Sequence, residues 1–226
     1  WIPALPDLHS ALTSTRMRVA DVGCGAGWST LAMAKAFPQA DVVGIDADPA
    51  TEYGAQRDGA RDIRDLVAAV SGAVRLKYIT LITHGAMLTA ERARSLWEAG
   101  INQFSISLDF LDERHDRARG IPGLGARILD VVPRLRAEGI DNVRFNTVIK
   151  EENLEHVMDI VRTAHALGVG VGFSTYTDMK NGNPTHFPRG ERLALVDEVV
   201  NALLAFKRKH RGVVTSSDWY LRQIPR

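Results

Sequence analysis

Arg18-Val-Ala-Asp-Val-Gly-Cys-Gly-Ala-Gly27 is an apolar strand pattern that runs into a glycine-rich turn, and the residues after it, Trp28 to Ala36, have the pattern of a helix. A second apolar run, Asp41 to Asp46, follows this helix. A strand, a helix and a strand in this order indicate two parallel strands joined by a right-handed crossover. The start of the chain therefore predicts an α/β fold.

The same alternation continues along the rest of the chain. Short runs rich in Val and Ile, often apolar on both faces, are separated by amphipathic helical stretches, which is typical of a parallel sheet. The predicted strands are Arg18 to Gly23, Asp41 to Asp46, Arg75 to Thr83, Gln103 to Asp109, Asn142 to Ile149 and Gly170 to Thr177. The predicted helices are Trp28 to Ala36, Ala60 to Val70, Thr89 to Ala99, Ala126 to Glu138, Asn153 to Leu167 and Arg189 to Arg211.

We expect these elements to form six parallel strands with outer helices in one continuous sheet, an open partial barrel of the (βα)6 type. A Rossmann-like βαβ unit beside a separate barrel remnant is the alternative. Thr89 is placed to cap a helix start, and Gly100, Gly139 and Gly168 each follow a helix where a left-handed residue belongs.

Length, charge and cysteine count exclude several classes of function. The 226 residues suit one large α/β domain or two small ones, and the net charge of +1 gives no general attraction to nucleic acid or anionic membranes. Runs of about 18 apolar residues are absent, which predicts no membrane span. The single cysteine, Cys24, excludes an internal disulfide and any multi-cysteine metal site built from these residues alone. We expect a cytoplasmic protein with a small-molecule ligand; the oligomeric state stays open.

The glycine-rich turn has the features of a ligand site. Gly23, Gly25 and Gly27 allow a tight turn and let a ligand approach the backbone without meeting Cβ atoms. Asp21 precedes the turn, and Asp46 at the tip of the second strand is placed to bind two ribose hydroxyls. The alternative is that the turn only packs the helix on the strand.

With these residues, Met17 to Ala50 resembles motifs I and II of class I methyltransferases that use S-adenosylmethionine (SAM). The resemblance implies that Asp21, Gly23, Gly25, Gly27 and Asp46 hold SAM. The later motifs of that family are not recognisable after residue 50.

From about residue 51 onward the chain resembles a different SAM-using family, the radical SAM enzymes. Segments in the order of that family include Thr80-Leu-Ile-Thr-His-Gly85, Ser105-Ile-Ser-Leu-Asp109 and Phe145-Asn-Thr-Val148. The resemblance implies SAM contacts at the carboxyl ends of the strands, from Thr83, His84, Ser107, Asp109 and Asn146. We therefore expect a methyltransferase-like unit over residues 1–50 that continues into a radical-SAM-like partial barrel over residues 51–226 in one sheet.

The radical SAM resemblance also implies a [4Fe-4S] cluster, held by three cysteines spaced C-x3-C-x2-C after the first barrel strand. The sequence has none there. Three hypotheses follow: a radical-SAM-type protein that has lost radical chemistry, a SAM-dependent methyltransferase that uses the front turn, and a non-catalytic fusion or truncated relic. His115 is expected to brace a loop rather than to donate a proton.

Overall fold

The computed structural model describes residues 18–22, 35, 41–45, 64, 67–68, 71–72, 79–176 and 184–224. The chain divides into two compact units, Trp1–Lys77 and Tyr78–Arg226. Within the predicted helices before residue 77, only residues 35, 64, 67 and 68 are described. The expected boundary near residue 50 stays a prediction.

Two parallel strands are described in the first unit. β1 (Arg18–Val22) pairs with β2 (Asp41–Ile45) from Arg18 opposite Asp41 to Val22 opposite Ile45. This pairing confirms the parallel arrangement expected for the opening strand–helix–strand pattern. The carboxyl ends of the two strands, Val22 and Ile45, therefore lie side by side.

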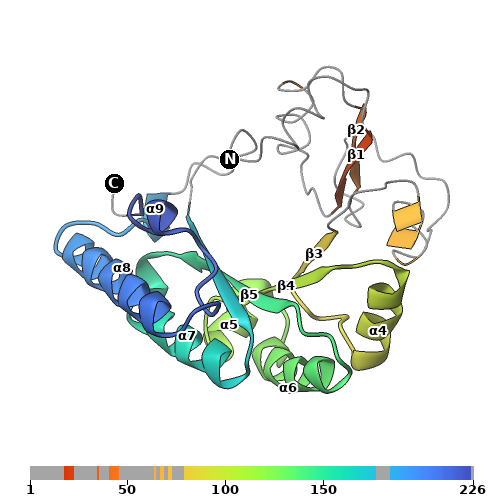
Figure 1. Ribbon diagram of the computed structural model, residues 1–226. Coiled ribbons are helices and arrows are strands. Elements are labelled where there is room, and N and C mark those ends of the chain that lie inside the picture. The colour runs from red at the N-terminus through yellow and green to blue at the C-terminus, as the bar shows by residue number, and fades with distance from the viewer. Residues whose placement is uncertain are drawn as a thin grey trace. The chain divides into compact units, whose positions relative to one another are not determined.

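The second unit contains a four-stranded parallel sheet in the order β3 (Thr80–Thr83), β4 (Gln103–Ser107), β5 (Val143–Ile149) and β6 (Gly170–Thr175). The helices of this unit are α4 (Ala90–Ala99), α5 (Glu113–Arg119), α6 (Leu124–Ala137), the 3-10 turn η2 (Glu151–His156), α7 (Val157–Ala166), the 3-10 turn η3 (Pro184–His186), α8 (Arg192–Lys209) and α9 (Asp218–Leu221). Figure 1 shows α4 to α8 on one side of the sheet and α9 beside the end of β6.

The α/β class and the parallel order of strands are therefore confirmed. The described strands form two sheets, and no described ladder joins β2 to β3. One continuous six-stranded sheet is thus not confirmed. The predicted strand over Arg75 to Thr83 is described as a strand only from Thr80.

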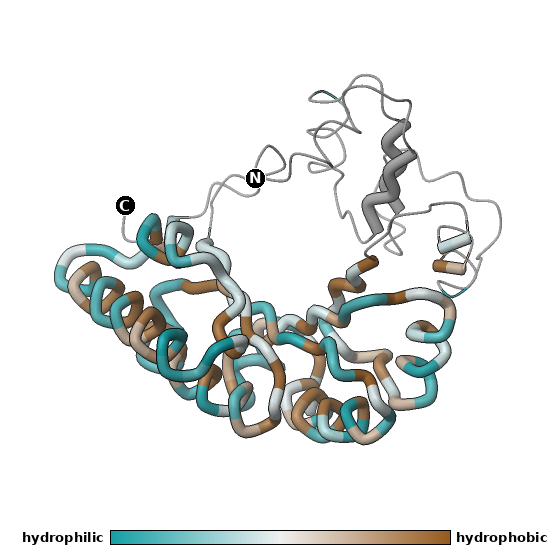
Figure 2. Tube along the Cα trace, viewed as in Figure 1, coloured by the Kyte–Doolittle hydropathy of each residue, from teal (hydrophilic) through white to brown (hydrophobic). Residues whose placement is uncertain are grey.

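The core lies between the sheet and its helices. Phe104 and Ile106 of β4 and Phe145 of β5 are fully buried, as are Ile128 of α6 and Ile160 of α7. Each such side chain stabilises the fold by about 1.5–3 kcal/mol relative to an exposed one. The tube in Figure 2 shows hydrophobic positions recurring along these strands and helices.

On β4 and β5 the opposite face of the sheet corrects the expectation of strands apolar on both sides, whereas β3 has buried Leu81 on one side and exposed Ile82 on the other. The burial of β5 alternates strictly along Val143–Ile149, and Arg144 and Asn146 point away from the core. Ser105 and Ser107 lie beside them on β4. The described helices α4 to α8 pack on the other face (Figure 1), and β5 alternates in burial as a half-covered strand does, whereas Ser105 on β4 is completely buried.

Helix ends follow the expected chemistry. The Thr89 hydroxyl oxygen accepts a hydrogen bond from the Arg92 N–H at 3.2 Å at the start of α4. Gly100, Gly139 and Gly168 have positive φ values of 122°, 78° and 66°. These four predictions are confirmed.

The outer edge of β6 is covered by the segment that follows α8. The Val171 N–H donates to the Val213 carbonyl at 2.7 Å, the Phe173 N–H to the Ser216 hydroxyl at 2.8 Å, and the Thr175 N–H to the Tyr220 hydroxyl at 3.1 Å. Val171 and Val214 form a parallel bridge. Three successive outward N–H groups of β6 are therefore satisfied.

Candidate functional site

The candidate site lies on the sheet surface opposite the helices, which we call the polar face. The strand register arranges its residues in rows that run across the sheet. One row joins Ser105, Arg144 and Gly170, and the next, nearer the carboxyl ends, joins Ser107, Asn146 and Gly172. Ligands of parallel α/β proteins bind at this end of the strands.

Ser107 and Asn146 are the two predicted ligand residues that the structure brings together. They are direct neighbours across β4 and β5, and both are half-buried. Within the described part of the chain, neither side chain makes a hydrogen bond. Gly172 beside Asn146 adds no side chain to the row. A hydroxyl and an amide with unused donors and acceptors are thus left available to a polar ligand.

Asp109 has a different environment from the one expected of a ligand residue. Its side chain is only 5% exposed. One carboxylate oxygen accepts a hydrogen bond from the Val148 N–H at 2.9 Å, and the other forms ion pairs with Arg119 at 3.3 Å and Lys150 at 3.4 Å. The carboxylate therefore ties the carboxyl ends of β4 and β5 to each other.

His115 belongs to the same buried polar network. Its ring is completely buried, and Nδ1 accepts a hydrogen bond from the Asp109 N–H at 3.3 Å. Burial, followed by the charge of Arg119, lowers the pKa of His115, so the ring is neutral with its proton on Nε2. Nε2 has no partner among the described residues. The bracing role predicted for His115 agrees with this geometry.

Two further side chains complete the network. The Asn153 amide donates to the carbonyls of Asp109 at 3.2 Å and Val148 at 2.8 Å. The buried Thr147 hydroxyl donates to the Leu108 carbonyl at 2.7 Å. Sequence reasoning missed Arg119, Lys150 and Asn153 as partners of Asp109, because their positions in the chain give no sign of which strand end they reach.

Thr83 and His84 are used in the turn after β3. The Thr83 hydroxyl oxygen accepts from the Gly85 N–H at 3.0 Å, and Thr83 alternates with exposed Ile82, which places it on the helix side. His84 is exposed, and its Nδ1 accepts from the Ala86 N–H at 3.1 Å. Their predicted ligand contacts remain predictions.

The predicted site in the first unit is described only in part. Asp21 lies in β1 opposite Gly44 of β2. Gly23, Gly25, Gly27 and Asp46 lie outside the described residues.

Comparison with known proteins identifies the family. Residues 42–164, more than half of the chain, match the Radical SAM superfamily. The chain therefore belongs to this superfamily, whose members use SAM and a [4Fe-4S] cluster. The matched span begins inside β2, so it overlaps the end of the segment that resembles a methyltransferase.

Two curated relatives narrow the comparison. The chain is 30% identical over 159 residues to a GTP 3',8-cyclase from Marinobacter nauticus, covering 70% of this chain and 46% of that protein. It is 34% identical over 91 residues to an AdoMet-dependent heme synthase from Methanosarcina barkeri, covering 40% and 26%. The chain thus spans half or less of the length of these relatives.

Solved structures agree on the fold. SuiB from Streptococcus suis has a TM-score of 0.58 at 13% identity, covering 94% of this chain and 52% of that one. Its SAM-bound form has a TM-score of 0.57 at 13% identity, with 93% and 52% coverage.

The residues present do not fit the family's cluster. A [4Fe-4S] cluster is held by cysteine thiolates, and the single cysteine, Cys24, lies before the matched span. Among the described residues, no group of three or more His, Cys, Asp or Glu could hold a metal ion.

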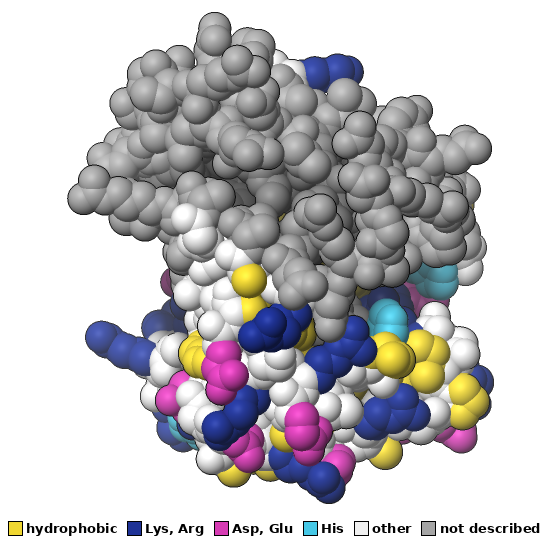
Figure 3. Space-filling model, turned by 90° about the vertical axis from the view of Figure 1, so that its right-hand side faces the viewer, with side chains coloured by type: hydrophobic (Ala, Val, Ile, Leu, Met, Phe, Trp, Pro, Cys, Tyr) yellow, Lys and Arg dark blue, Asp and Glu magenta, His cyan; other side chains and the backbone are white. Residues whose placement is uncertain are grey.

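The described helices are too short or too polar to cross a bilayer. Figure 3 shows cationic and anionic side chains interspersed on the surface around α4.

Proposed function

We propose that this chain binds SAM, or a nucleoside derived from it, on the polar face of a radical SAM fold, and that its own residues do not support radical chemistry. The observation that carries the proposal is the Ser107–Asn146 pair, which lies at the ligand end of the strands and makes no side-chain hydrogen bond to any described residue. Membership of a SAM-using superfamily supports the choice of ligand.

The chain's residues have separate tasks in this proposal. Ser107 and Asn146 donate and accept hydrogen bonds to the ligand's hydroxyl and amino groups. Asp109, His115 and Asn153 fix the strand ends that carry them. Bound SAM supplies a sulfonium group whose bonds to carbon are activated. Reductive cleavage needs an electron donor, and one cysteine cannot hold the family's cluster.

Titration calorimetry of the purified chain with SAM and S-adenosylhomocysteine tests the proposal. We expect Asn146→Ala to weaken binding about tenfold, because a hydrogen-bonded polar group contributes roughly 1–1.5 kcal/mol, and Ser107→Ala to weaken it in the same direction. Asn201→Ala, on the exposed surface of α8, is the matched control and leaves binding unchanged. Equal affinity in the Asn146 and Asn201 variants would overturn the assignment.

The front turn is a second candidate for the SAM site, as in a class I methyltransferase. The observation in its favour is the parallel β1–β2 pair, whose ends Val22 and Ile45 are neighbours. Gly25→Val and Asp46→Ala separate the two candidates. If these variants abolish SAM binding while Asn146→Ala does not, the methyltransferase hypothesis replaces the proposed site on the polar face. If the folded chain binds neither SAM nor S-adenosylhomocysteine, the hypothesis of a non-catalytic relic replaces both.

A further inference from the structure

We propose a second ligand site, for a phosphate-bearing small molecule, in a cavity near the amino ends of β4, β5 and β6. The cavity has a volume of about 340 Å³, and its lining includes Gln103, Arg144, Gly170, Arg211, Gly212 and Thr215. Gln103 and Gly170 begin their strands, and Arg144 is the second residue of β5. All of these residues belong to the second unit.

The cavity is positively charged. Arg144 and Arg211 both line it, and neither forms an ion pair with any described residue. Its acidic lining residue, Asp141, has a cation of its own, since Arg136 approaches its carboxylate at 3.7 Å. Two guanidinium groups that have no acidic partner among the described residues thus line the same cavity. Arginine presents several N–H donors in a planar fork that matches the oxygens of a phosphate.

Arg144 is held in place before any ligand arrives. Its Nε donates to the Ser105 hydroxyl at 3.3 Å, which leaves its terminal nitrogens as further donors. The side chain is half-buried, and Ser105 is completely buried. A cation in partly desolvated surroundings attracts an anion more strongly than a fully solvated one does. Arg211 is exposed and adds a second, adjustable charge.

The wall opposite Arg144 is built by the segment that covers β6. A Cβ atom at Gly170 would lie 2.9 Å from the Thr215 methyl carbon, 3.5 Å from the Arg144 Cβ and 3.7 Å from the Gly212 carbonyl oxygen. Glycine at this position therefore brings Thr215 and Arg144 together over the strand. The Val171–Val214 bridge fixes this segment, so the wall is formed by backbone pairing.

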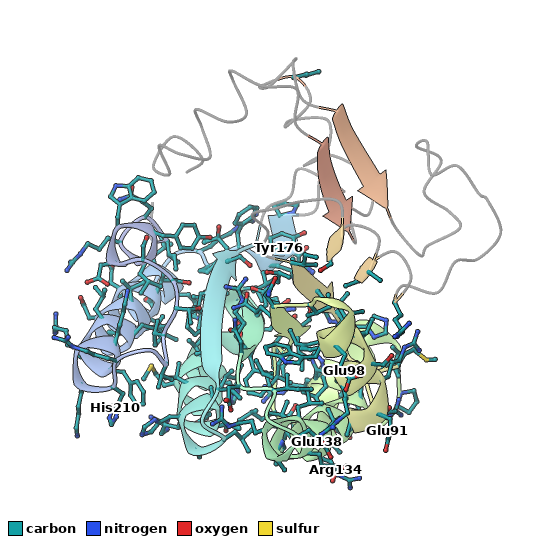
Figure 4. The ribbon with its side chains drawn as sticks, turned by 45° about the vertical axis from the view of Figure 1, so that its right-hand side comes forward. Glu91, Glu98, Arg134, Glu138, Tyr176 and His210 are labelled. Atoms are coloured by element: carbon teal, nitrogen blue, oxygen red, sulfur yellow. The ribbon has the colours of Figure 1, made fainter. Side chains whose placement is uncertain are left out.

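The cavity lining does not include Ser107 or Asn146, whose row lies two residues further along the strands. Figure 4 labels Tyr176, just after β6, and His210, just before Arg211, at opposite ends of the unit. The volume accommodates a phosphate group with additional ligand atoms, because small-molecule pockets span about 300–1,000 Å³. Inorganic phosphate and a nucleoside monophosphate share the required chemistry.

Calorimetric titration of the full chain with inorganic phosphate and with AMP, at constant ionic strength set with sodium chloride, tests the proposal. We expect both probes to bind, and Arg211→Gln and Arg144→Gln each to weaken binding about tenfold. Arg211 is exposed, so its variant keeps the fold even if the Arg144 variant does not. Arg208→Gln removes an equivalent charge from the last turn of α8, outside the cavity lining, and is the matched control.

The outcomes are distinct. Tighter binding of AMP than of phosphate, lost in the Arg211 variant, identifies an organic phosphate as the ligand, and equal binding identifies free phosphate. Binding that is absent, or that falls equally in the Arg208 and Arg211 variants, overturns the proposal. Ser107→Ala leaves phosphate binding unchanged, which keeps the result independent of the SAM site.

Discussion

Asp109 holds two cations and a backbone N–H at the junction of β4 and β5, so its removal leaves Arg119 and Lys150 without their acidic partner. We expect Asp109→Ala to lower the free energy of unfolding by about 3 kcal/mol, because breaking a buried ion pair leaves the remaining charges without a counter-charge. Asp130→Ala breaks an exposed i,i+4 pair with Arg134 and serves as the control, with a loss below about 0.5 kcal/mol. Urea unfolding measures both; equal losses would contradict the network.

His115 gives the stability a specific dependence on pH. Its pKa is lowered in the fold, mainly by burial, so the unfolded chain binds more protons at this residue as the pH falls below its ordinary value of 6.5. The stability contributed by the neutral ring is therefore complete above that pH and decreases as the pH falls through it, by at most about 1.4 kcal/mol per pH unit.

A variant isolates this contribution. His115→Asn offers an oxygen near the position of Nδ1 and does not titrate. Denaturant melts from pH 7.5 to 5 should show a shallower decline in the variant than in the wild type. If stability declined equally with pH in the variant and the wild type, the pKa of His115 would not differ between the folded and unfolded states.

At the residue scale, sequence patterns predicted where polar side chains gather, but not which of them bond to the protein and which are left for a ligand. Ser107, Asp109 and Asn146 all appeared as ligand residues at strand ends. The structure commits Asp109 to the protein and leaves Ser107 and Asn146 unpaired among the described residues. The difference depends on Arg119 and Lys150, which reach Asp109 only after the chain has folded.

The bounds of helices and strands were predicted more accurately than the roles of single residues. The predicted strand at Gln103 to Asp109 is described as Gln103–Ser107, and the helix at Thr89 to Ala99 as Ala90–Ala99. Sequence reasoning missed α5, although Asp112 accepts a hydrogen bond from the Arg114 N–H as an N-cap does. It also missed the Val214 bridge, because a single pair has no strand pattern.

The covering segment of β6 depends on the absence of a side chain at Gly170. We expect Gly170→Ala to lower the melting temperature, since its Cβ would meet the Thr215 methyl carbon at 2.9 Å, at a cost of about 1–3 kcal/mol for overpacking. Thr215→Ser removes that methyl group. The double variant should recover most of the loss in a thermal melt; additive losses would show that the contact is not the cause.

At the scale of the whole molecule, family membership was predicted from an ordered series of segments and confirmed by the superfamily match. The expected methyltransferase-like front unit stays a prediction, because its turn lies outside the described residues. Periodicity alone could not decide whether two sets of parallel strands join, since the same strand pattern suits one sheet or two.

The cysteine count leads to a direct measurement on the whole chain. After anaerobic reconstitution with iron and sulfide, we expect the purified chain to lack the absorbance and electron paramagnetic resonance spectrum of a [4Fe-4S] cluster, because it offers one thiolate. Cys24→Ala is the control for adventitious iron and should give the same iron content. A stoichiometric cluster that Cys24→Ala abolishes would contradict this expectation.

The segment after α8 also affects solubility. Val213, Ser216 and Tyr220 accept hydrogen bonds from the outward N–H groups of β6. Without them this edge would be an open template on which a strand of another molecule could assemble. A chain cut by a protease ahead of Val213 is therefore expected to self-associate while its polar-face residues remain intact, so the C-terminal segment protects the protein from aggregation.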